Sequence, residues 1–548
     1  MRRATPPPPS GTPARRILPD YRITGLLLSV ASFLPAARPY EMLNRTTVRL
    51  AATNWTNNRP YALNRWGPIE NWDVSGATSF DFLFDSWKKF DADISRWNTK
   101  NSSSFAAMFY MCHEFDRNIG PWRTAKAKSF ADMFLAAFRF DRDLDLWQTS
   151  KVKNMRNMFA HARSFNGDVS PWDTSDVRYF QSMFFNATSF DGDVSRWDVG
   201  NGTDFPNMFE RAVKFDGDLS AWNMSSATDM GRMFARNTFD GDIGAWDVQR
   251  VHTIQRLFWN NRRYRGEGIG SWDVGRVTDM HNMFCGASSF DGDVSGWDTS
   301  NVRSFYRMFR NATSFAGSLE GWDTRKAVDG EMEEMFYRAR NFTGAGVGPW
   351  DVSRLTSINS IFRKCDAFNQ NLNNWDSSKF VDISVVFRNA TAFNGDVSSW
   401  DTSRVTDMYN IFKHALIFNR DISNWDVSSV KNMYGALAHA PNFTAPLDRW
   451  DVSKVTEMRD LFECALKFNR SSVLEWKMGA NVKTDWMFKR GTYCVNGFKK
   501  DYAKGWFGID MTKMKDWAKA PDSGVVRRPT LGGTVAALLG AVAILIAW

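Results

Sequence analysis

Two hydrophobic periods alternate along most of the chain. The segment 400–424 shows both, with the sequence WDTSRVTDMYNIFKHALIFNRDISN. Apolar and polar residues alternate around Trp400, which is typical of a short β-strand. Apolar residues then recur at spacings of three and four, which is typical of one face of an α-helix: Val405, Met408, Ile411, Phe412 and Ala415. A polar turn follows, so the pattern predicts one strand, one short helix and one turn in 25 residues.

This pattern recurs along the chain at a nearly constant interval. A tryptophan marks each unit, at Trp72, Trp97, Trp122, Trp147, Trp172, Trp197, Trp222, Trp246, Trp272, Trp297, Trp322, Trp350, Trp375, Trp400, Trp425, Trp450 and Trp476. The first seven are 25 residues apart, and Asp follows the Trp directly in twelve of the seventeen units. Phe lies twelve residues after the Trp in fifteen of them. Such self-similarity indicates a solenoid, because one unit of this size cannot bury its own apolar face.

We therefore predict an α/β solenoid of about 17 stacked coils over residues 72–490, each coil with a short strand and a short helix. The apolar spacing around the strand matches that of leucine-rich repeats. Stacking would place equivalent aromatic residues in continuous buried ladders, for example Trp172, Trp197, Trp297, Trp400 and Trp425, and Phe159, Phe184, Phe309 and Phe412.

The repeat W-D-V-S-x-V-T-x-M-x-x-M-F resembles that of the BspA-like leucine-rich-repeat surface proteins, found in many mycoplasma surface lipoproteins and in microalgal proteins. The resemblance covers about residues 72–490, with departures near 246–272 and 322–350. It implies a surface-exposed solenoid, often assigned to adhesion and in many members of unknown function. It implies no catalytic residues and no cofactor.

The net charge of +9 belongs to the two ends of the chain. Residues 1–22 carry five Arg and one Asp, and residues 477–548 carry twelve Lys or Arg and five Asp, so these ends contribute +4 and +7. The remaining residues sum to −2. A near-neutral middle predicts no broad phosphate-binding face, and hence no nucleic-acid partner.

The N-terminal segment, residues 1–40, predicts a disordered basic stretch followed by a signal peptide or signal anchor. Its apolar part is Ile23–Leu34, which is short for a membrane span but suits the apolar region of a secretory signal. Residues 41–71 precede the first repeat and are expected to cap the solenoid.

The C-terminal segment predicts attachment to a membrane. Residues 491–524 depart from the repeat and are expected to form a second cap and a linker. Residues 525–548 end in an apolar tail that fits either a GPI-attachment signal or a transmembrane helix. The small residues before it are candidate GPI attachment sites: Asp522, Ser523 and Gly524.

Three sequons are candidate glycosylation sites, since each opens N-A-T fourteen residues after its repeat Trp: Asn186, Asn311 and Asn389. The alternative is inheritance of the tripeptide with the repeat. Two His residues, His414 and His439, share a position in adjacent coils and are expected to form a surface pair. Cys112 and Cys365 lie at a small apolar position, and Cys464 and Cys494 are a candidate disulfide.

A column of aspartates ends the turn of many coils: Asp168, Asp193, Asp218, Asp293, Asp396 and Asp421. Stacking would bring these carboxylates close together, which requires backbone hydrogen bonds or a cation. We expect Asx-type turns that satisfy the N–H groups of the next coil. A Ca²⁺ ladder is the weaker alternative, because the calcium-solenoid signature is absent.

The sequence contains no recognised catalytic motif. These features favour a non-enzymatic, membrane-anchored surface solenoid that binds protein or glycan ligands. The alternatives are a cell-coat protein that self-associates or binds wall polysaccharide and, less favoured, an enzyme confined to the caps.

Overall fold

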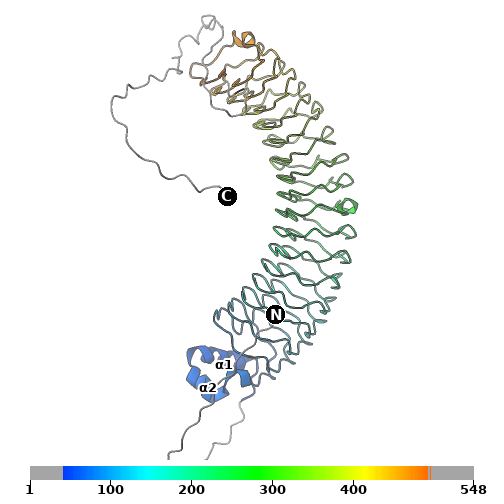
Figure 1. The fold of residues 1–548 in the computed structure, drawn as a ribbon, viewed down its shortest axis with the longest axis vertical. Coiled ribbons are helices and arrows are strands. Elements are labelled where there is room, and N and C mark those ends of the chain that lie inside the picture. The colour runs from blue at the N-terminus through cyan, green and yellow to red at the C-terminus, as the bar shows by residue number, and fades with distance from the viewer. Residues whose placement is uncertain (1–40, 491–493, 495–548) are drawn as a thin grey trace, which may run out of the picture.

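The computed structural model describes residues 41–490 and Cys494, and these residues form one curved stack of coils (Figure 1). A single hydrophobic core runs through the whole stack, from Leu43 to Met487. The stack bends into an arc, which gives the molecule a concave and a convex side (Figure 1).

Two helices close the N-terminal end of the stack. Helix α1 spans Arg45–Asn57 and helix α2 spans Arg59–Trp66, and a short 3₁₀ helix, η1, follows at Ile69–Asn71. The side chain of Asn44 accepts hydrogen bonds from two backbone N–H groups of the first turn of α1, which explains where this helix begins. The Trp55 ring meets the Trp72 ring edge-on at 5.7 Å, so α1 shields the first ring of the Trp ladder. Residues 41–71 thus cover the first coil, where the sequence predicts a cap.

The coils themselves differ from the prediction. Within residues 72–490 the structure contains no α-helix, only two 3₁₀ helices, η2 at Ile269–Ser271 and η3 at Arg470–Val473. The strand predicted around each Trp is also not formed. Adjacent coils pair instead through single-residue parallel bridges, mostly seven residues after the Trp, as between Asn154 and Tyr179. The prediction of one strand and one helix per coil is therefore wrong.

The backbone hydrogen bonds show why no helix forms. The N–H groups of Asn157, Phe159 and His161 donate to carbonyls of the next coil, whereas those of Met158 and Ala160 donate to the carbonyl three residues earlier. Half of the donors that an α-helix would use internally are thus taken by the neighbouring coil. The segment therefore forms a series of turns, in which alternate N–H groups donate within the coil and to the next coil.

Two positions in each coil adopt the left-handed conformation, ten and fourteen residues after the Trp in a regular coil. Asn157 and His161 are one such pair, with φ of 53° and 61°. This four-residue interval resembles the 3.6-residue period of a helix, so the same apolar spacing fits both structures. Stacking decides between them, because a neighbouring coil supplies carbonyl acceptors.

The aromatic ladders fill the core. The Trp and Phe residues chosen to represent them in the sequence are all buried, with 3% or less exposed. Neighbouring rings lie 6.0–6.5 Å apart along the Trp column but 5.3–6.1 Å apart along the column of Phe twelve residues later. The coils are therefore closer together on the Phe side, which places the turn-rich segment on the concave side of the arc.

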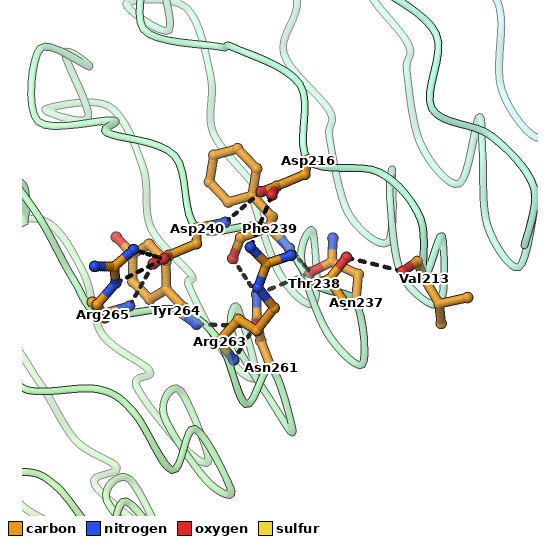
Figure 2. A network of polar contacts seen from close by, with 10 residues as sticks. All are labelled: Val213, Asp216, Asn237, Thr238, Phe239, Asp240, Asn261, Arg263, Tyr264 and Arg265. Carbon is orange, nitrogen blue, oxygen red and sulfur yellow. Dashed lines mark hydrogen bonds and ion pairs between the residues drawn. The ribbon is translucent and has the colours of Figure 1, made fainter.

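An irregular pair of coils shows how the stack tolerates a change of length. The coil from Trp222 to Trp246 is one residue short, and buried Asn237 and Asn261 replace the usual Ala there (Figure 2). The Asn261 amide donates to the Asn237 side chain at 2.9 Å and to the Phe239 carbonyl at 2.8 Å. The second bond satisfies a backbone carbonyl at the shortened corner, which has lost one residue, and the first links the two buried amides.

Candidate binding face

The six aspartates considered as calcium ligands each close a turn of their own coil. Their Oδ1 atoms accept a hydrogen bond of 2.8–3.0 Å from the backbone N–H two residues later: Asp168, Asp193, Asp218, Asp293, Asp396 and Asp421. The bond from Ser195 holds the pKa of Asp193 below its usual value. These are Asx turns, although the donor lies in the same coil rather than in the next one. Within the described residues no group of three or more His, Cys, Asp or Glu side chains is arranged to hold a metal ion.

The three candidate glycosylation sites share one backbone conformation. Asn186, Asn311 and Asn389 occupy the left-handed position, with φ of 57°, 59° and 60°, and their side chains are half-buried. Asn adopts this conformation more readily than most residues, so the fold alone accounts for Asn at these positions. Glycosylation stays a prediction.

The other singled-out side chains are buried or paired. The His414 and His439 rings stack at 4.3 Å, and His439 Nε2 lies 3.4 Å from a carboxylate oxygen of Glu463. Cys112 and Cys365 are fully buried. Cys464 forms a disulfide with Cys494, with the Cα atoms 5.3 Å apart.

The predicted signal and anchor fall outside the described residues. This applies to residues 1–40, to residues 525–548 and to the candidate attachment residues Asp522, Ser523 and Gly524. In the part of the chain that is described, no helix is long and apolar enough to cross a membrane.

The concave side carries a charge pattern that the regional charge count concealed. Three positions of the turn-rich segment, ten, thirteen and fourteen residues after the Trp in a regular coil, define what we call the basic columns. Between residues 207 and 413 these columns contain two carboxylates, Glu210 and Glu334, and eleven cations: Arg211, Arg232, Arg236, Arg256, Arg307, Arg310, Arg338, Arg363, Lys364, Arg388 and Lys413. A column rich in carboxylates runs beside them. Five of its residues form bridges between coils: Asp204, Asp229, Asp279, Asp382 and Asp407. Glu331, whose backbone carbonyl accepts the Phe305 N–H, takes the equivalent place in its own coil.

Two aromatic residues, Trp259 and Tyr337, lie within the basic columns, and several cations pack around each of their rings. The guanidinium groups of Arg232, Arg236 and Arg256 lie 6.0, 4.1 and 5.8 Å from the centre of the Trp259 ring. Four further cations lie 4.9–6.0 Å from the ring of Tyr337 in the same way: Arg310, Arg338, Arg363 and Lys364. Each ring stabilises nearby positive charge through its electron-rich face.

A depression of about 570 Å³ lies between these two clusters. It forms in a coil where small residues occupy the basic columns. One of them, Cys285, is 7% exposed and lies beneath the depression. Arg256 and Trp259 line one wall, and Tyr306 and Arg307 line the other. The side chains that complete it are polar: Asn260, His281, Asn282, Arg310, Asn311 and Glu331.

Partial burial and neighbouring like charges shift the pKa values of several groups on this face. Burial and the neighbouring Arg232 lower the pKa of Arg256. Burial, above all, lowers the pKa of Arg363 and raises that of Glu210. Arg307 and Arg310 both pair with Glu334. The stacked arginines thus outnumber their carboxylates, which leaves positive charge for an anionic ligand to neutralise.

A count of charge by region of the chain does not reveal this face. Counting by position within the repeat would have revealed it, since the 25-residue interval places equivalent residues side by side. The prediction of no broad phosphate-binding face and no nucleic-acid partner rested on the regional count, and it stays a prediction.

The architecture defines a repeat solenoid protein. A family model described as "Mycoplasma protein of unknown function, DUF285" matches residues 56–166, 139–240, 228–344, 330–436 and 396–500. These segments overlap and cover most of the chain, so the chain belongs to this family. No curated protein matches it.

One of the solved structures that match is titled "Crystal structure of TLR13-ssRNA13 complex". It is 10% identical, the match covers 67% of this chain and 52% of that chain, and the TM-score is 0.20. The chain thus matches about half the length of that structure, and a similarity this low carries no argument about function.

Proposed function

We propose that this protein is a non-enzymatic, membrane-anchored surface solenoid that binds protein or glycan ligands through its concave side. The observation that carries the proposal is the depression beside Trp259, whose walls are polar. It lies on a scaffold in which the buried columns of the repeat are fixed by packing. Long curved surfaces of stacked repeats are suited to ligand binding, because exposed positions vary without disturbing the core. The resemblance to BspA-like leucine-rich-repeat surface proteins supports the same assignment.

The surface location rests on two further observations. The disulfide between Cys464 and Cys494 favours an oxidising compartment. The apolar segments 23–34 and 531–548 fit a secretory signal and a membrane attachment.

The first experiment locates the chain on cells. Full-length protein with a tag inserted directly after residue 40, before buried Leu43, is labelled on intact cells, which are then treated with a GPI-specific phospholipase. We expect surface labelling, with release if the anchor is GPI and retention if a C-terminal helix spans the membrane. An absence of surface labelling contradicts the proposal.

The second experiment tests ligand binding. Fluorescent full-length protein, held in lipid nanodiscs so that no detergent reaches the cells, is titrated onto intact cells, and we expect saturable binding by a monomer. Concentration-dependent self-association without saturable binding favours a structural coat protein.

A further inference from the structure

The depression combines features that recognise a carbohydrate. Trp259 and Tyr306 line the depression. A guanidinium already lies over one face of each ring, Arg236 at 4.1 Å from Trp259 and Arg307 at 4.5 Å from Tyr306, so a sugar would pack its C–H face on the opposite face. Asn260, Asn282 and Asn311 add amides that both donate and accept hydrogen bonds. Its volume falls within the range of about 300–1,000 Å³ that is usual for small-molecule sites.

The arginines indicate that the ligand carries negative charge. Arg256 and Arg307 line the depression from opposite sides, and Arg232 and Arg236 stand behind Arg256 around the Trp259 ring. The guanidinium of Arg256 is suited to donate two parallel hydrogen bonds to a carboxylate or a sulfate group, a geometry that lysine lacks. Arg307 already donates from Nε and Nη2 to Glu334, at 3.1 and 3.0 Å, so it offers a ligand its remaining Nη1 and its charge. An anion bound there would also relieve the repulsion between stacked cations.

The carboxylates beside the basic columns argue against a polyphosphate. Glu331 lines the depression, and His281 beside it is paired with Asp279, with 2.7 Å between Nδ1 and Oδ1. A nucleic-acid backbone bears a negative charge at every step and has few donors to offer these groups. Sugar hydroxyls, in contrast, donate to carboxylates. The adjacent acidic column therefore favours a ligand with anionic groups spaced among hydroxyls.

We propose that the depression between Trp259 and Tyr306 binds an acidic polysaccharide, with sulfate or carboxylate groups held by Arg256 and Arg307. This inference deepens the proposed function and rests on it. It requires an unmodified Asn311, since an N-linked glycan on that residue would cover the site. The N-A-T tripeptide at this position is then inherited with the repeat.

The test uses the full-length chain in detergent and polysaccharides with matched backbones. Dextran sulfate and neutral dextran share a backbone and differ in sulfation, and polygalacturonate and its methyl ester share a backbone and differ in free carboxylates. We expect dextran sulfate or polygalacturonate to bind and neutral dextran not to bind. Tighter binding of a charged polymer than of its own neutral partner identifies sulfate or carboxylate as the recognised group.

Two variants locate the binding in the depression. Arg256→Gln combined with Arg307→Gln should weaken binding by about tenfold or more, since each removes a charge-assisted hydrogen bond. Arg196→Gln combined with Arg404→Gln removes the same two charges from exposed residues outside the basic columns and should leave binding unchanged. Thermal unfolding of this control should match that of the unsubstituted chain, and Arg256→Gln alone should weaken binding without loss of the ion pair between Arg307 and Glu334.

Several outcomes overturn the inference. Equal weakening by the control with two exposed arginines replaced would show general charge attraction, and tighter binding of a single-stranded RNA 20-mer at the same salt concentration would show a nucleic-acid site. A glycan found on Asn311 by mass spectrometry would also contradict it. If no acidic polysaccharide binds while the chain still binds cells saturably, the ligand class is wrong and the proposed function stands.

Discussion

The indole Nε1 of Trp297 donates a hydrogen bond of 2.9 Å to the backbone carbonyl of Ile269, 28 residues earlier. That carbonyl also accepts the backbone N–H of Trp272 at 3.1 Å. The same indole bond links many other pairs of coils, from Trp97, Trp122, Trp147, Trp172, Trp197, Trp222, Trp246, Trp272, Trp322, Trp375, Trp400, Trp425, Trp450 and Trp476. Tryptophan therefore serves this column as a donor between coils as well as a large apolar side chain.

This bond predicts unequal effects for one substitution at two sites. Trp297→Phe removes the indole N–H and leaves a buried carbonyl with one partner fewer, whereas the Nε1 atom of Trp350 is buried without a hydrogen-bond partner. Trp350→Phe loses similar ring volume but no hydrogen bond. We expect Trp297→Phe to lower the free energy of unfolding by about 1–3 kcal/mol more than Trp350→Phe.

Amide hydrogen exchange of the affected coils is the suitable measurement, because a solenoid can open locally. Equal loss of protection around the two sites would show that ring volume alone determines the effect.

The sequence allowed the Trp ladder to be predicted but not the path of the backbone. Repeat spacing alone aligns Trp272 with Trp297. The choice between a helix and a series of turns depends on whether the N–H of Phe159 donates within its coil or to the next one, and apolar spacing is the same in both cases. The candidate site was hidden for a related reason, since Trp259 and Tyr306 are 47 positions apart in the chain and meet only when coils stack.

The Asx turns predict no response to calcium. The Oδ1 atom of Asp421 accepts the Ser423 N–H at 2.9 Å, and this bond holds the pKa of Asp421 below its usual value. Asp421→Asn keeps the acceptor and should leave stability nearly unchanged, whereas Asp421→Ala should destabilise its turn by about 0.5–2 kcal/mol, as loss of a similar helix cap does. Thermal melting with added CaCl₂ and with a chelator should coincide. A rise in melting temperature with CaCl₂ that Asp421→Asn abolishes would support the calcium ladder instead.

The disulfide predicts that the C-terminal coils depend on redox conditions. The bond between Cys464 and Cys494 closes a loop of 30 residues, which stabilises the folded state by about 3–4 kcal/mol in the chain-entropy description. A reductant should therefore increase amide exchange around residues 461–468 and leave the coils near Trp172 unaffected. Cys494→Ser should reproduce this loss and remove the sensitivity to reductant. Unchanged exchange after reduction would mean that packing alone holds the last coils.

The stacked histidines predict that the same end of the solenoid weakens in acid. Burial and, next, the neighbouring His439 lower the pKa of His414 to about 4. Lys413 and Arg388 act in the same direction, and Glu463 opposes them. Because the folded state binds fewer protons than the unfolded chain, whose His pKa is about 6.5, stability is complete above that pH and falls as pH drops toward about 4.

His414→Asn should remove this dependence and keep the left-handed backbone, where φ is 61°. We expect the pH-dependent loss of about 1–3 kcal/mol in urea unfolding between pH 7 and pH 4 to shrink in this variant. His252→Asn, at an exposed residue near the middle of the stack, is the matched control and should follow the unsubstituted chain. If both variants show the same dependence as the unsubstituted chain, the acid sensitivity originates in other groups, and the His414–His439 stack contributes only packing.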